Sequence, residues 1–390
     1  MKIMCLGGAG RICRETAADL ALYSDFEQIA IADFDEKAGA QVVAAINDPR
    51  VTFVKTDVNN HADAVSKMRG FDVVADGTAI SMNGKTSAII AEAGCHAVNL
   101  NGFGDENAFA DVFADKKLVF VPGFGMTPGV TQMMVMSAAN QLDSVDTARI
   151  SHGAYRPFAF SRSIAETTAY EYDPALPGRV VYEDGEFIQV PPFARPLEVV
   201  LPEPYGRTTQ YIIPHAETLT VAAALRGKGV RLVETRGTWP PENMRLVRAL
   251  YEYGILRNDK ITVNGAVAGV MDCLCEYLLK SREGTTTGLY GYALHVEVTG
   301  ERGGCRVRHT LNHTHPRSDG SVEGWEGLRA YTRNVGVPMS VAAQLIAKGR
   351  VLENRVGLLT PELAFDPADV FAELGRRGIH IHETIAPIPA

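Results

Sequence analysis

Short runs of apolar, β-branched residues alternate with longer segments of helical spacing over about the first 125 residues. Such an alternation is typical of a parallel sheet whose strands are joined by crossover helices. We expect strands in six of these runs: Ile3–Leu6, Ile29–Ala32, Val51–Val54, Val73–Ala75, Ala97–Leu100 and Leu118–Val121. The sequence therefore predicts an α/β fold that begins with a doubly wound parallel sheet.

Helical spacing occupies the gaps between these strands. The segment Arg14–Leu22 places its apolar residues on one face, and Lys85–Ala93 ends directly before Gly94, which is suited to a helix C-cap. We therefore expect the helix that begins at Lys85 to end at this glycine.

The pattern changes after Pro128-Gly129, where an apolar helix over Val130–Leu142 leads into β-rich runs separated by prolines and glycines. This region predicts a second, α/β (α+β) domain over 128–334, following a first domain over 1–127. Further helices are expected over Glu242–Tyr253, Val267–Ser281, Ser340–Lys348 and Asp366–Arg376.

Composition narrows the range of partners and compartments. The 390 residues carry a net charge of −8 without a Lys/Arg-rich run, which disfavours binding to nucleic acid or anionic membrane and favours a small-molecule partner. The six cysteines contain no CxxC pair, so we expect reduced thiols rather than a disulfide framework or zinc ribbon. Because no signal peptide and no long apolar stretch is apparent, we expect a cytoplasmic protein.

A glycine-rich turn follows the first strand. Gly8 and Gly10 match the first two glycines of the GxGxxG motif, and Cys13 occupies the third position. In a strand–turn–helix context this motif is typical of a Rossmann domain, where pyrophosphate lies against the helix N-terminus. We therefore expect Gly8, Gly10, Arg11 and Ile12 to form the cofactor turn, with a ligand-free tight turn as the alternative.

Asp33 ends the second strand, 23 residues after Gly10. An acid at about this distance can accept hydrogen bonds from both ribose hydroxyls and would repel a 2′-phosphate. Phe34 follows where NADP enzymes often have Arg, so NAD is favoured over NADP. A helix N-cap is the alternative role for Asp33.

Other polar or glycine-rich segments follow the later strands. Ligands of open α/β sheets bind beyond the carboxyl ends of the strands, so we expect cofactor and substrate to lie along these segments. The candidates are Asp57-Val58, Gly77-Thr78, Asn99 and Gly125-Met126-Thr127.

The order GGAGRI, ADFDEKA, TDV and PGFGMTPGVTQMM resembles the saccharopine dehydrogenase family, and the resemblance continues through PHAETLT and LRGKGVRLVETRGTW to FAELGRRGIHI. The closer likeness is to bacterial members of the lysine 6-dehydrogenase or saccharopine reductase kind. This resemblance implies that residues 335–390 return to the first domain and that Asp57-Val58 approaches the adenine of the cofactor. It also implies that the second domain supplies the substrate site and the homodimer contacts. Cys13 departs from the family pattern, and so does Asn99, because relatives often have Asp after the fifth strand.

Arginines in the second domain are candidates for binding a substrate carboxylate, because a guanidinium can bind it through two hydrogen bonds. Arg156, Arg162 and Ser163 lie in one polar, aromatic segment, and Arg236 lies in a second. A structural ion pair is an equally good interpretation for each arginine.

Oxidation of an amine requires a base, and histidine titrates in the useful range. His215 is followed by Glu217, which would share its face on a strand; His152 is the second candidate, and Glu166 is a carboxylate that could bind the substrate ammonium. A structural histidine is the alternative in each case. No metal site is expected, because the spacing of His309, His313 and His315 fits no standard metal motif and hydride transfer needs no metal.

The resemblance implies an NAD-dependent oxidoreductase that acts on the C–N bond of an amino acid or related amine and forms an imine. Three alternatives remain open: a reductive opine or carboxynorspermidine-type synthase, a dehydrogenase of a hydroxyl substrate, and a non-catalytic nucleotide-binding sensor.

Overall fold

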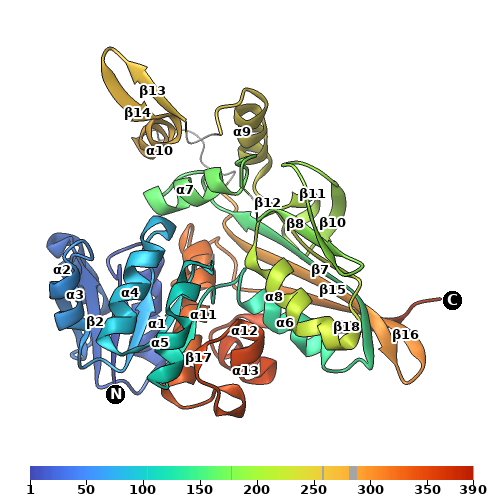
Figure 1. The fold of residues 1–390 in the computed structure, drawn as a ribbon, viewed down its shortest axis with the longest axis horizontal. Coiled ribbons are helices and arrows are strands. Elements are labelled where there is room, and N and C mark those ends of the chain that lie inside the picture. The colour runs from blue at the N-terminus through green and yellow to red at the C-terminus, as the bar shows by residue number, and fades with distance from the viewer. Residues whose placement is uncertain (103, 177, 257–258, 281–287, 390) are drawn as a thin grey trace. The chain divides into compact units, whose positions relative to one another are not determined.

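The computed structural model describes residues 1–102, 104–176, 178–256, 259–280 and 288–389. The chain forms two units: the first contains Met1–Ser137 and Thr332–Gly378, and the second contains Ala138–Tyr331 and the chain from Ile379 onward. These limits differ from the expected ones mainly at the C-terminus, where the last residues belong to the second unit. Figure 1 shows the elements of both units in chain order by colour.

The first unit contains a parallel seven-stranded sheet with the order β17-β6-β5-β4-β1-β2-β3. Six strands confirm the expected doubly wound sheet: β1 (Lys2–Leu6), β2 (Gln28–Asp33), β3 (Val51–Lys55), β4 (Val73–Asp76), β5 (His96–Asn99) and β6 (Val119–Val121). The seventh, β17 (Gly357–Leu358), comes from the C-terminal part of the chain and pairs with β6. Its two residues are too short to give a strand pattern, so the sequence did not reveal it.

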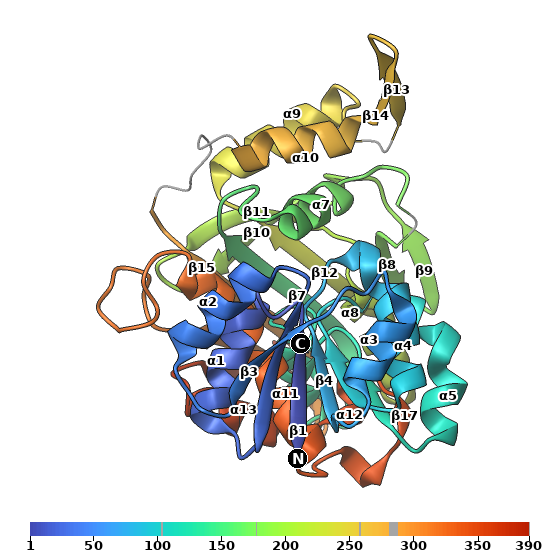
Figure 2. The ribbon, with the colours of Figure 1, turned by 90° about the vertical axis from the view of Figure 1, so that its left-hand side faces the viewer.

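Helices cover both faces of this sheet, which explains the near-continuous apolar character of its strands. Figure 2 shows α1 (Cys13–Tyr23) and α2 (Glu36–Ile46) on one side of the strands, and α3 (His61–Met68), α4 (Asn83–Ala93) and α5 (Ala110–Asp115) on the other. The remaining helices that lie wholly or largely in this unit are α6 (Val130–Ala139), α11 (Arg329–Ala347), α12 (Pro361–Ala364) and α13 (Pro367–Gly375). As expected, Gly94 caps α4 in a left-handed conformation with φ 81°.

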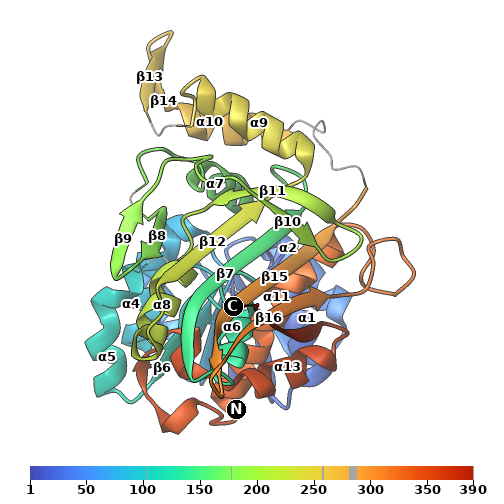
Figure 3. The same ribbon diagram turned by 90° about the vertical axis from the view of Figure 1, so that its right-hand side faces the viewer.

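The second unit contains a mixed nine-stranded sheet, in which β10-β11-β12-β7-β15-β16-β18 form one path and β8 and β9 branch from β12. Figure 3 shows β12, β7, β15 and β16 side by side. The bounds are β7 (Ser144–Tyr155), β8 (Val180–Glu183), β9 (Glu186–Gln189), β10 (Leu197–Leu201), β11 (Gly206–Ile212), β12 (Leu232–Thr238), β15 (Gly291–Arg302), β16 (Cys305–Thr314) and β18 (His380–Pro387). Because β18 pairs with β16, residues 380–387 lie in this sheet and not in the first unit, where we had placed them.

Among its described residues, the second unit has the α-helices α7 (Arg162–Tyr170), α8 (Ala216–Leu225), α9 (Pro241–Glu252) and α10 (Val270–Lys280). Helix α9 matches its prediction closely. Helix α10 begins later than expected, because Ala266–Gly269 forms β14 of a hairpin with β13 (Lys260–Val263). No helix in the described ranges combines the length and apolar character needed to cross a bilayer.

Candidate functional site

The glycine turn between β1 and α1 is held by backbone hydrogen bonds in the first unit. The amides of Gly7 and Gly8 donate to the carbonyl oxygen of Ala32 on β2, at 2.8 and 3.1 Å. A Cβ at Gly8 would lie 2.7 Å from the carbonyl oxygen of Cys5, so only glycine fits there. Arg11 and Ile12 continue the turn into α1, whose first N–H groups can bind an anion. This geometry fits a pyrophosphate.

Cys13 replaces the third glycine of the motif and is fully buried at the start of α1. Its thiol contacts the carbonyl oxygens of Leu6 and Ala75, at 3.5 and 3.9 Å. A Cβ at Gly77 would lie 2.6 Å from the Cβ of Cys13, so the larger residue at 13 is accommodated by glycine at 77. The close helix–strand packing is therefore kept although the motif is altered.

Asp33 lies at the end of β2 with its carboxylate fixed against the glycine turn. Its two oxygens accept hydrogen bonds from the amides of Ala9 and Asp35, each at 3.1 Å. A carboxylate has further lone pairs, so both oxygens retain capacity for ribose hydroxyls. The alternative role as a helix N-cap is wrong, because Asp35 caps α2 by accepting from the amide of Ala38.

The other cofactor candidates also follow strands of the first sheet. Phe34 is 73% exposed after β2, and Asp57 is exposed and Val58 half-buried after β3. Thr78, after β4, donates from its amide and hydroxyl to the carboxylate of Asp76, at 2.9 and 2.7 Å. Since carboxyl ends of parallel strands share one edge, the fold brings these residues to the edge that carries the glycine turn.

Asn99 differs from the other candidates, because its side chain is occupied within the protein. Its amide nitrogen donates to Asn83 at 2.9 Å and to Glu106 at 3.3 Å, and its oxygen accepts from the amides of Asn101 and Gly123. These bonds tie the ends of β5 and β6 together. Asn99 therefore shapes the loops beside the cofactor edge.

The Gly125-Met126-Thr127 segment lies between β6 and α6. Gly125 donates from its amide to the carbonyl oxygen of Pro128 at 2.8 Å, so the segment forms a tight loop. Met126 is only 1% exposed and packs in the interior, whereas Thr127 is half-buried.

In the second unit, His152 and His215 form a buried pair. Their rings stack with centroids 5.5 Å apart and an interplanar angle of 21°. The Nδ1 atom of His215 lies 3.4 Å from Oε2 of Glu217, and its Nε2 atom lies 3.8 Å from Oε1 of Glu171. His215 precedes helix α8, where we had expected a strand; the Ala-rich sequence that follows it favours a helix. Glu217 nevertheless reaches the ring from the first turn.

The two histidines have opposite protonation properties. Burial alone would lower the pKa of His215, but the carboxylates of Glu217 and Glu171 outweigh it and raise this pKa to about 10. Burial, together with the adjacent His215 cation, lowers the pKa of His152 to about 3. At neutral pH the pair therefore consists of an imidazolium at 215 and a neutral ring at 152. No sequence spacing connects Glu171 to His215, so the sequence did not reveal that partner.

Arg156 is buried near this pair, and most of its donors are used within the protein. Its Nη1 donates to the carbonyl oxygens of Pro157 and Phe158, and its Nη2 donates to Thr168 at 2.7 Å. The guanidinium also lies 5.5 Å from the ring centroid of Trp239. Arg156 thus holds the segment after β7 and has only Nε without a hydrogen bond.

The remaining substrate candidates form ion pairs. Arg162 on α7 pairs with Glu166 one turn later at 2.9 Å, and its side chain is 58% exposed. Ser163 is half-buried beside it. Arg236 pairs with Glu234 at 2.9 Å with both side chains buried. For both arginines the structure shows the ion pair that we had considered as the alternative.

Metal-ligating side chains do not cluster in the described part of the chain, where no three His, Cys, Asp or Glu lie close enough to hold an ion. His309 pairs instead with Glu383 of β18 at 2.7 Å. The Nε2 atom of His315 lies 2.9 Å from the hydroxyl oxygen of Tyr205.

Comparison with known families covers nearly the whole chain. Residues 3–117 match the saccharopine dehydrogenase NADP binding domain, and residues 125–379 match the saccharopine dehydrogenase C-terminal domain. The chain belongs to the saccharopine dehydrogenase family. It is therefore an NAD(P)-dependent oxidoreductase, and the glycine turn and Asp33 fall within the matched nucleotide-binding domain of this family.

Two solved structures of similar fold support the same architecture. Saccharopine dehydrogenase (L-Glu forming) from Saccharomyces cerevisiae has a TM-score of 0.75 at 12% identity, covering 99% of each chain. Homospermidine synthase from Legionella pneumophila, solved in complex with NAD, has a TM-score of 0.65 at 10% identity, covering 98% of this chain and 91% of that one. At this identity both comparisons establish the fold.

Proposed function

We propose that this protein oxidises the C–N bond of an amino acid or related amine with NAD, in the manner of lysine 6-dehydrogenase or saccharopine dehydrogenase. The observation that carries the proposal is the buried His215 between Glu171 and Glu217 in a member of this family. An acid–base group of this kind can remove the proton from a substrate ammonium, which must be neutral before its carbon can lose a hydride.

The proton step can be assigned to His215. When bound, NAD would supply the acceptor for the hydride of the amine carbon, and the substrate imine would then be open to hydrolysis by water. An alkyl ammonium has a pKa of about 10.4, close to the pKa of about 10 for His215, so proton transfer between them is nearly balanced. His215 is therefore a base for oxidation at alkaline pH and, when protonated at neutral pH, an acid for imine reduction.

NAD is the proposed cofactor because of Asp33. Its carboxylate is held beside the glycine turn by the amide of Ala9, where it would accept hydrogen bonds from ribose hydroxyls and repel a 2′-phosphate, and the exposed Phe34 beside it offers no charge to compensate. The matched domain family carries NADP in its description, so this choice rests on these two residues.

The test follows absorbance of the reduced nicotinamide while amino acids and polyamines are screened with NAD and NADP from pH 7 to 10.5. We expect oxidation of at least one amine, with a rate that rises toward pH 10. His215→Gln should lower this rate at least about tenfold, as expected for loss of a general base, whereas His61→Gln, at an exposed site of the first unit, should not. Absence of turnover with every amine at alkaline pH would contradict the proposal.

A reductive synthase that joins an amine to an oxoacid is a second candidate, because His215 is protonated and ready to donate at neutral pH. In the same assay, consumption of reduced nicotinamide only when both an amine and an oxoacid are present would favour this function.

A further inference from the structure

A cavity of about 470 Å³ lies in the second unit, and neither His152 nor His215 lines it. Its walls come from the end of β7, from β11, from the loop that precedes β10, and from α9. Cavities of a few hundred Å³ are typical of small-molecule sites. This cavity is therefore a candidate ligand site in addition to the region of the histidine pair.

Aromatic side chains form much of the cavity wall. Tyr155 and Tyr205 lie with ring centroids 4.3 Å apart, and Phe193 lies 5.1 Å from Tyr211. Trp239 adds an indole ring. Burial raises the pKa of Tyr155 to about 12, so its phenol is uncharged. Walls of this kind suit a flat, apolar ligand body.

Three arginines supply positive charge to the same cavity. Arg245 and Arg248 lie on the face of α9 that lines it, and Arg207 comes from β11. Arg248 pairs with Glu252 at 3.0 Å and lies 4.9 Å above the ring of Phe193. Arg207 and Arg245 form no ion pair within the described ranges, so their charges remain available in a chain of net charge −8.

The lining contains no Asp or Glu among the described residues. Three acids lie close to the lining. Glu252 pairs with Arg248, Glu198 accepts a hydrogen bond from Thr209, and Glu242 of α9 lies near enough to Tyr155 to contribute to the rise of its pKa. The described lining itself thus combines aromatic walls with three arginines and no carboxylate.

We propose that this cavity binds a small planar organic anion, whose carboxylate or phosphate is held by Arg207 and Arg245 and whose flat body packs against Trp239 and the tyrosines. The ligand is separate from the amine substrate, because none of the residues of the histidine pair lines the cavity. Trp239 lines the cavity, and its ring also lies under the guanidinium of Arg156, which is buried near the histidine pair.

The test uses isothermal titration calorimetry of the full chain with phenylacetate, phenyl phosphate and the neutral phenylacetamide. We expect at least one anion to bind, and the amide to bind at least about tenfold more weakly. The double variant Arg207→Ala/Arg245→Ala should weaken anion binding about tenfold or more. Arg226→Ala, an exposed arginine of the same unit outside the cavity, is the matched control and should leave binding unchanged.

The location can be checked by fluorescence, because the chain has only two tryptophans. In a Trp325→Phe background, the anion should quench Trp239. Binding of phenylacetate alone or phenyl phosphate alone would support the proposal and identify the headgroup. Absence of binding by both anions, equal binding of the amide, or full affinity in the double arginine variant would overturn it. None of these readouts depends on amine oxidation.

Discussion

At the scale of single residues, the charge of His215 makes the stability of the folded chain depend on pH. Its pKa of about 10 in the folded chain lies above the usual value of 6.5 for histidine, so the folded state holds an extra proton between these values. The resulting stability is fully present below pH 6.5 and is lost as the pH rises through about 10.

We therefore expect the free energy of unfolding to fall between pH 7 and 10, by at most about 1.4 kcal/mol per pH unit. In His215→Gln this dependence should be much weaker, because glutamine does not titrate. Urea unfolding at several pH values would measure both slopes. Parallel slopes for the two proteins would show that His215 is not protonated in the folded state.

We propose that cofactor choice depends on Asp33. Asp33→Ala removes the proposed acceptor for the ribose hydroxyls, and hydrogen bonds to a charged group contribute about 1.5–3 kcal/mol. We expect NAD affinity to fall by about 1–3 kcal/mol in calorimetry. The control Asp111→Ala changes an exposed acid of α5 in the same unit. Unchanged NAD affinity in Asp33→Ala would refute the assignment.

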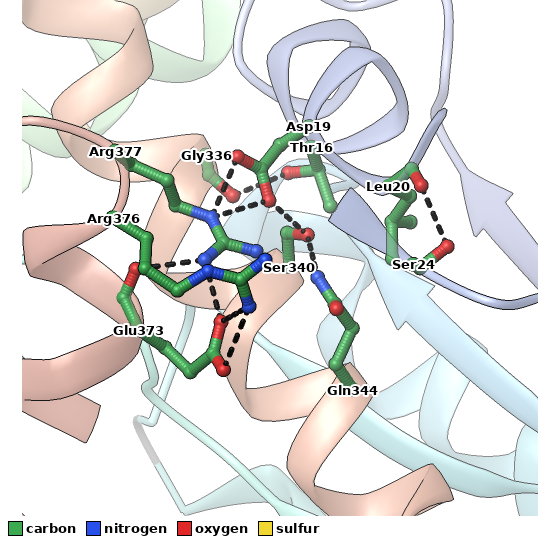
Figure 4. Close-up of polar contacts among 10 residues, drawn as sticks. All are labelled: Thr16, Asp19, Leu20, Ser24, Gly336, Ser340, Gln344, Glu373, Arg376 and Arg377. Carbon is green, nitrogen blue, oxygen red and sulfur yellow. Dashed lines mark hydrogen bonds and ion pairs between the residues drawn. The ribbon is translucent and has the colours of Figure 1, made fainter. Parts of the chain in front are cut away.

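Among the elements, the contact of α13 with α1 is distinctive because it depends on a buried ion pair, shown in Figure 4. The Nε atom of Arg377 lies 2.8 Å from Oδ1 of Asp19, and the two side chains are 0% and 1% exposed. Ser340 of α11 donates to the same carboxylate at 2.6 Å, and Glu373 also pairs with Arg377. Helices α1 and α11 and the turn that follows α13 are thus joined at one carboxylate.

Removing one partner of this pair should be costly, because the other charge stays buried. We expect Arg377→Met to lower the free energy of unfolding by about 3–5 kcal/mol. The adjacent Arg376→Met is a matched control, since Arg376 is 55% exposed and should contribute about 0–1 kcal/mol. Urea denaturation measures both. The double variant Asp19→Leu/Arg377→Met should recover much of the lost free energy of unfolding, because no charge is then left buried. If Arg377→Met and Arg376→Met lower the free energy of unfolding equally, the buried pair has no special role.

At the scale of the whole molecule, the oligomeric state is a proposal that rests on the family resemblance. We propose a homodimer, as the resemblance implied. Light scattering coupled to gel filtration should then give about twice the chain mass of 42.2 kDa over a range of concentrations. A mass of one chain at every concentration would refute this proposal.

Local sequence predicted the nucleotide-binding half well. Strands β1 to β6, the glycine turn and the cap at Gly94 all depend on contiguous residues, because buried parallel strands, tight turns and helix ends each leave a short pattern. The family resemblance, carried by motifs spread over the chain, was likewise sufficient for the fold class and the reaction type.

Other features required contacts between distant residues. The sequence offered His215 as a base with Glu217 beside it, but only the fold brings Glu171 to the same ring, and both carboxylates set its charge, since a pKa depends on neighbours in space. The same holds for the Arg377–Asp19 pair, whose members lie at opposite ends of the sequence. Chain-local patterns thus determined the elements and the cofactor turn, whereas the fold alone decided which buried charges meet, because residues far apart in sequence interact only after packing brings them together.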